Sequence, residues 1–148
     1  MKAILIDPER KAITEVEYDG DYHSINKLID ADLFDVVRIS PDGDGIFVDD
    51  EGLYRQNHYW KLDGCASPLA GKGLVLGVDA QGESISPQST TIEKLEQLVH
   101  FINYKDAVVI AEAADKAAEY WAGDNPSIIR MSTADILKSR GYTGSPTE

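Results

Sequence analysis

Residues 68–82 read Pro-Leu-Ala-Gly-Lys-Gly-Leu-Val-Leu-Gly-Val-Asp-Ala-Gln-Gly, an apolar run between two clusters of turn-forming residues. The run over 74–78 has the length and the aliphatic content of a buried strand. Four of the 12 glycines of the chain fall in this stretch. Glycine recurs where a backbone takes a positive φ or approaches another backbone closely. We therefore predict a central strand over 74–78, entered and left through tight turns.

Short apolar runs before this stretch predict a mainly antiparallel sheet. The runs over 3–6 and 12–18 are separated by turn residues and predict a hairpin. Ser24 can cap a short helix after the second strand. Further strands are predicted over 34–39, 46–49, 58–62 and 83–85.

From Thr90 onward the apolar period changes from two residues to 3.6, which predicts a helical C-terminal third. Thr90 and Glu93 have the spacing of a capping box, and the apolar stripe that follows predicts a helix over 91–104. A second helix is predicted over 107–122, although its β-branched residues 108–110 also fit a strand. Ser132 and Asp135 predict a last short helix that ends near residue 141.

The fold class expected from this order is α+β: an antiparallel or mixed β-sheet with a short helix after the second strand and a helical C-terminal third. We expect an acidic α+β domain over residues 1–104. A helical extension over 105–148 should pack on it, with a loose tail from about residue 143. A chain of this length buries enough surface to fold without a disulfide or a metal ion.

Charge is the strongest global signal, because the net charge is −12 at pH 7. Residues 1–55 carry 14 acidic and 6 basic residues, whereas residues 56–148 carry 12 and 8. Such a surface repels nucleic acid and anionic membranes and favours a basic partner. The chain has one cysteine, Cys65, and no apolar run as long as a membrane span. These features favour a reducing, cytoplasmic location.

An acidic hairpin is the first candidate site, and its members are Asp42, Asp44, Asp49, Asp50 and Glu51. An EF-hand loop that starts at Asp42 would need an oxygen ligand at its fifth position, glycine at its sixth and glutamate at its twelfth. The chain has Ile, Phe and Leu there. We therefore predict no metal and no cofactor, and interpret the hairpin as a partner-binding surface. Catalysis by residues 49–51 remains an alternative.

Residues 54–60 form the densest aromatic cluster, and Tyr54, Tyr59 and Trp60 fit either core packing or an exposed contact surface. Gly71, Lys72 and Gly73 suggest a phosphate loop, but a P-loop has more residues between its glycines and opens a helix. A small-ligand or nucleotide site at this turn remains an alternative. The three histidines have no ligand spacing, so no catalytic residue is predicted.

Residues 1–8, 34–39, 45–53 (Gly-Ile-Phe-Val-Asp-Asp-Glu-Gly-Leu) and 68–77 carry a resemblance to a known family. The chain resembles small acidic proteins of unknown function that are encoded by bacteriophages, prophages and plasmids. The resemblance covers about residues 1–104. It implies a small accessory protein that binds and inhibits a host protein, and it assigns no catalytic residue to this chain.

The function expected from the sequence is therefore that of a non-enzymatic protein-binding accessory of a mobile element. Its partner would be a host or phage protein with a basic surface, contacted through the acidic N-terminal third. We expect no direct binding to nucleic acid or membrane. The oligomeric state is not readable from the sequence.

Overall fold

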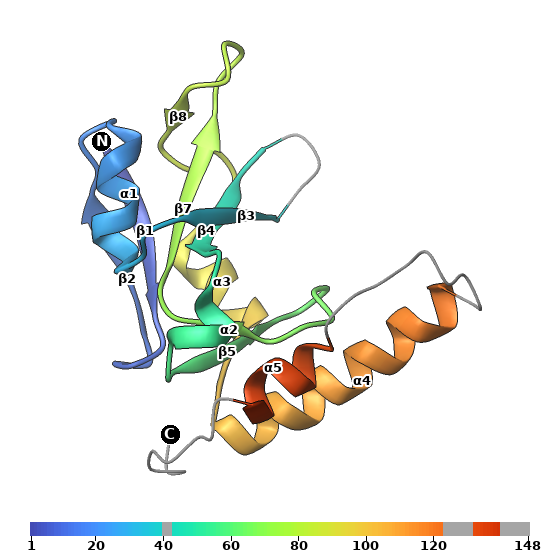
Figure 1. Ribbon diagram of the computed structural model, residues 1–148. Coiled ribbons are helices and arrows are strands. Elements are labelled where there is room, and N and C mark those ends of the chain that lie inside the picture. The colour runs from blue at the N-terminus through green and yellow to red at the C-terminus, as the bar shows by residue number, and fades with distance from the viewer. Residues whose placement is uncertain (40–42, 123–131, 140–148) are drawn as a thin grey trace.

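The computed structural model describes residues 1–39, 43–122 and 132–139 (Figure 1). The elements, in chain order, are β1 (Lys2–Asp7), β2 (Ala12–Glu17), α1 (Tyr22–Ile29), β3 (Phe34–Arg38), β4 (Gly45–Asp49), α2 (Gly52–Arg55), β5 (Tyr59–Leu62), β6 (Leu69–Ala70), β7 (Gly73–Val78), β8 (Ser84–Ile85), α3 (Ile92–Leu98), β9 (Val99–Ile102), α4 (Tyr104–Ala122) and α5 (Thr133–Ser139). All strand pairs among the described residues are antiparallel. The expected α+β class, with a helical C-terminal part, is confirmed.

The main sheet has the order β2-β1-β7-β4-β3, and β8 pairs with the far end of β7. β7 therefore lies between two neighbours, as the sequence predicted for residues 74–78. Its residues 73–77 are all buried. Side chains alternate between the two faces of a strand, so Leu74 and Leu76 reach one layer of core and Val75 reaches the other.

The two faces of the main sheet are covered by different layers. Helix α1 packs on one face, where Ile25 and Ile29 join a core cluster with Phe47 and Leu74. The other face packs on α3 and on a small second sheet, with Leu95 and Trp60 in the shared core. In Figure 1 this second layer lies below the main sheet.

The second sheet, in the order β6-β5-β9, corrects one sequence prediction. The helix predicted over 91–104 ends at Leu98, and Val99–Ile102 forms β9 instead. An apolar stripe at helical spacing does not exclude a strand when its last members are β-branched or aromatic. Phe101 pairs with Trp60 across the strands, so tertiary pairing overrides the helical period. The cap is also one residue later than predicted, because the Lys94 amide donates to Thr91 Oγ1 at 3.1 Å.

The C-terminal helices pack against the second sheet. Helix α4 runs through residues 108–110, so the helical alternative for this segment is the correct one. The predicted cap of the last helix is present, because the Asp135 amide donates to Ser132 Oγ at 3.1 Å. Alanines 107 and 111 of α4 and Leu137 of α5 share a buried cluster with Tyr59 of β5. The predicted helix end near 141 and the tail from 143 lie outside the described residues.

Candidate functional site

Asp44 is a structural anchor, so it does not belong to the partner-binding surface that the sequence predicted. Its side chain is fully buried, and its carboxylate accepts hydrogen bonds from three consecutive backbone amides, those of Gln88 (2.8 Å), Ser89 (3.0 Å) and Thr90 (2.8 Å). Burial raises the pKa of Asp44, but these hydrogen bonds outweigh it and hold the pKa below its ordinary value of 3.8. Asp44 thus fixes the start of β4 against the segment before α3. Asp42 lies outside the described residues.

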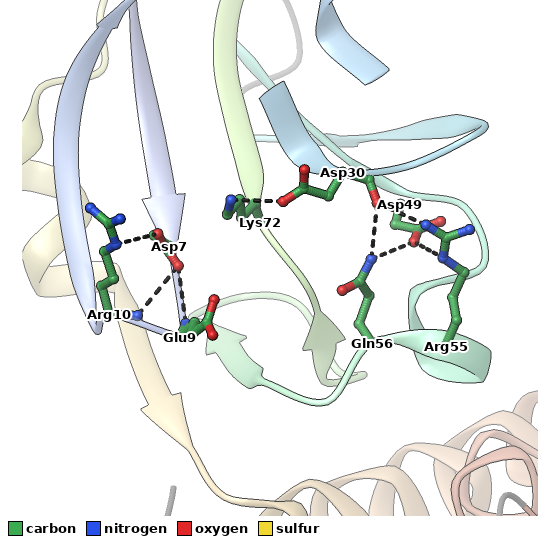
Figure 2. Close-up of polar contacts among 8 residues, drawn as sticks. All are labelled: Asp7, Glu9, Arg10, Asp30, Asp49, Arg55, Gln56 and Lys72. Carbon is green, nitrogen blue, oxygen red and sulfur yellow. Dashed lines mark hydrogen bonds and ion pairs between the residues drawn. The ribbon is translucent and has the colours of Figure 1, made fainter. Parts of the chain in front are cut away.

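Asp49 is also engaged within the fold. Its side chain is 1% exposed, and its Oδ2 atom lies 3.0 Å from Arg55 Nε and 2.9 Å from Gln56 Nε2 (Figure 2). The carboxylate therefore holds α2 and the residue after it against the end of β4, and it offers no free charge to a partner. Asp50 and Glu51 are exposed, and neither has an ion-pair partner among the described residues.

The aromatic cluster divides between core and surface. Tyr59 is 1% exposed and Trp60 is fully buried, so neither presents its side chain to a partner. Core packing is therefore the correct interpretation for both residues, and neither is part of a contact surface. The indole of Trp60 donates to the Gly71 carbonyl at 2.9 Å, which satisfies its only polar atom. Tyr54, on α2, is 53% exposed and remains a surface residue.

The Gly71, Lys72 and Gly73 turn has structural roles at all three positions. Gly71 has φ +86°, a conformation that favours glycine. A Cβ at Gly73 would stand 2.8 Å from the Ile46 side chain. Lys72 Nζ lies 2.7 Å from an oxygen of Asp30, the residue that ends α1, and this hydrogen bond raises the pKa of Lys72 (Figure 2). None of the three hollows described below is lined by this turn.

An apolar groove of about 260 Å³ lies beside the outer strand of the main sheet. It is lined by Asp35, Val37, Val48, Asp49, Asp50, Gly52, Leu53, Tyr54, Ser67, Pro68, Leu69, Ala70 and Ile136. The lining comes from strands β3, β4 and β6 and from helices α2 and α5. Elements distant in sequence thus converge on one concave surface.

The charge of the groove is of one sign. Its described lining includes three aspartates and no lysine, arginine or histidine. Arg55 neutralises Asp49. Asp35 and Asp50 are exposed and have no ion-pair partner among the described residues, so each adds a negative charge to the rim. This arrangement suits a ligand with an apolar part and a basic part.

The groove retains some of the predicted site and adds residues that the sequence did not reveal. Asp49, Asp50 and Tyr54 of the predicted surface line it. The sequence did not identify Asp35, Val37 and Ile136 as site residues. Only the packing of α5 brings Ile136 to the same groove as the two β3 residues. The one sequence signal was the spacing of Asp35 and Val37, because residues two positions apart in a strand lie on the same face.

Two further hollows are larger but more open. One, of about 460 Å³, lies between the β1–β2 hairpin and the start of α3, where Lys2, Glu15 and Glu93 give it mixed charge. The other, of about 420 Å³, lies between the N-terminus and α1. Neither combines an apolar lining with charge of a single sign, because Lys27 lines the second beside Glu17 and Asp19.

No helix within the described residues combines the length and the apolar character that crossing a bilayer requires.

Comparison with known proteins identifies the family alone. Searches of curated proteins and of solved structures found no match to the chain. Residues 1–100 match the family described as "Domain of unknown function (DUF3846)", which is well over half of the chain, and the protein therefore belongs to this family.

Proposed function

We propose that this protein is a non-enzymatic binding protein that holds a basic segment of another protein in the groove between β3, α2 and α5. The observation that carries the proposal is the apolar lining of the groove together with the carboxylates of Asp35 and Asp50, neither of which has an ion-pair partner within the described part of the chain. Apolar contact supplies affinity in such a site, while the rim charges raise the rate of association and select against acidic partners.

A binding role is favoured over catalysis because the buried carboxylates of the hairpin have structural roles. Asp44 and Asp49 accept hydrogen bonds that hold β4 in place. The hydrogen bonds that Asp44 accepts lower its pKa, which makes its carboxylate a poor proton acceptor. The proposal also places the protein in the cytoplasm of a bacterial host, as an accessory of a phage or plasmid that inhibits a host protein. This part rests on the resemblance of residues 1–104.

The proposal is tested by affinity capture from a bacterial lysate with three tagged proteins. These are the wild type, the groove variant Asp35→Asn/Asp50→Asn and the control variant Glu93→Gln/Glu96→Gln. Both variants lose two exposed negative charges, but residues 93 and 96 lie on α3, outside the groove. Asparagine at position 35 keeps an oxygen that can accept the hydrogen bond that Asp35 now accepts from the Val36 amide.

We expect the wild type and the control to retain the same basic protein at about 0.05 M salt. The groove variant should retain it about three- to tenfold less, as rim charges typically contribute. Retention should fall at about 0.5 M salt because the charges are screened. Equal retention by the groove variant and the control would contradict the proposal.

A further inference from the structure

Strand β3 ends the main sheet and has one unpaired edge among the described strands. The backbone atoms on that edge can be identified from the hydrogen bonds on either side of β3. The Ile39 amide donates to Asp44 and the Asp50 amide donates to Leu33, so residues 33 and 39 direct their backbone groups at β4 and its ends. Backbone direction alternates along an antiparallel strand. Phe34, Val36 and Arg38 therefore direct their amides and carbonyls away from β4.

The outward amide of Val36 is occupied by a neighbouring side chain. It donates to Asp35 Oδ1 at 2.8 Å. An unpaired strand edge pairs readily with other chains, and charged side chains are one means of suppressing this. Here the same carboxylate that caps the edge also lines the groove. A cation that binds Asp35 would draw it from the Val36 amide and free that donor.

We propose that the partner segment binds as an additional antiparallel strand on β3, and that its basic side chain opens the edge by pairing with Asp35. This inference rests on the proposed function, because it specifies how a basic segment occupies the same groove. Alternate side chains of an added strand lie on one face. A basic residue opposite Asp35 and an apolar residue opposite Val37 would then both project to the groove side of the sheet. Main-chain pairing supplies affinity in this mode, and the alternate side chains supply selectivity.

The probe is the fluorescently labelled peptide Thr-Lys-Thr-Val-Thr-Lys-Thr, whose side-chain order is the same in both chain directions. It places a valine opposite Val37 and a lysine opposite Asp35 in either orientation. Binding is measured by fluorescence anisotropy to full-length Val36→Pro and Val36→Ala. Both variants lose the valine side chain, but only proline also removes the outward amide, and proline is tolerated on an unpaired edge. We expect Val36→Pro to bind about tenfold more weakly than Val36→Ala.

Methylated peptides repeat the test on the unmodified protein, so it does not depend on the folding of the proline variant. Methyl groups on the amides of the two threonines that flank valine block groups that face β3 in the antiparallel arrangement. A methyl group on the valine amide, which faces away, is the matched control. We expect strong loss with the first peptide and little with the second. Equal binding of both peptides, together with equal binding by the two Val36 variants, overturns strand addition.

The role of Asp35 is tested with a probe in which serine replaces both lysines. The wild type should prefer the lysine probe, and Asp35→Ala should bind both probes equally, because its Val36 amide is no longer capped. Weakened capture by Asp35→Asn/Asp50→Asn with no effect of amide methylation would leave the groove function intact and exclude the strand. A wild-type dimer that Val36→Pro abolishes, measured by light scattering, would assign the edge to a second copy and overturn the proposal.

Discussion

Asp44 joins two parts of the chain that are far apart in sequence. Its carboxylate accepts hydrogen bonds from the backbone amides of residues 88–90. Gly77 lies directly against this carboxylate. A Cβ at Gly77 would stand 3.0 Å from Asp44 Oδ1 and 2.8 Å from the Ser86 carbonyl. This supports the inference from the glycine pattern that a close neighbour leaves no space for a side chain at this point of the central strand.

We expect Asp44→Asn to lower the free energy of unfolding by about 2–4 kcal/mol, because an amide group cannot accept all of the hydrogen bonds that the carboxylate accepts. The folded pKa of Asp44 is lowered, so its contribution is present above the ordinary value of 3.8 and is lost as the pH falls through the folded pKa. Between about pH 7 and pH 3, the free energy of unfolding measured in urea should fall less in the variant than in the wild type. A variant as stable as the wild type at pH 7 would contradict the anchor role.

At the scale of single elements, the sequence predicted strands better than the boundary between helix and strand. The residues of β7 were recognisable because an aliphatic run between glycine-rich turns has few alternatives. Residues 95, 98, 99 and 102 satisfy a helical stripe, yet Val99 and Ile102 belong to β9. The deciding term is the pairing of β9 with β5, a contact between residues about 40 positions apart, which a local pattern does not contain.

Helix α5 depends on a carboxylate supplied by α4. Asp115 accepts hydrogen bonds from Ser132 Oγ (2.6 Å), the Thr133 amide (2.9 Å) and the Ala134 amide (3.0 Å). Burial raises the pKa of Asp115, but these hydrogen bonds outweigh it and lower the pKa below its ordinary value. The cap predicted at Ser132 is therefore one part of a larger arrangement: Ser132 accepts from the Asp135 amide, and a carboxylate of a second helix accepts from the amides of residues 133 and 134.

We expect Asp115→Asn to loosen α5, because losing a helix cap typically costs about 0.5–2 kcal/mol. Hydrogen exchange of the amides over 133–139 should accelerate while that of β7 stays unchanged. The matched control is Asp135→Asn, an exposed aspartate in the first turn of the same helix. Equal acceleration in both variants would mean that charge near the helix start, rather than the Asp115 contacts, stabilises α5.

Across the whole molecule, the acidic composition predicted the sign of the candidate site but not its location. Of the residues first assigned to the surface, Asp50 and Tyr54 line the groove and are exposed, and Asp49 lines it as a buried, ion-paired residue. Asp44, Tyr59 and Trp60 are buried and lie outside its lining. Composition does not distinguish a solvated aspartate from one that accepts hydrogen bonds from backbone amides. The groove exists only where β3, α2 and α5 meet, so it depends on the packing of the C-terminal helices.

That packing also bears on the division of the chain near residue 104, which stays a prediction. The family match ends at residue 100, and the cores on both faces of the main sheet are formed by residues before that point. A third cluster joins Tyr59 and Ala70 to the C-terminal helices through Ala107, Ala111 and Leu137. A chain that ends at Asn103 should therefore fold, but with Tyr59 newly exposed.

We expect this truncated chain to unfold cooperatively in urea with about 2–5 kcal/mol less stability, because the burial of large side chains on the second sheet is lost. The transition is followed by the fluorescence of Trp60, which is the only tryptophan left after truncation. The matched control is full-length Trp121→Phe, in which Trp60 is again the single reporter. A midpoint equal to that of the control would mean that the C-terminal helices do not stabilise the rest of the fold. Loss of a cooperative transition would instead make these helices part of one indivisible domain, with the groove as a feature of the entire chain.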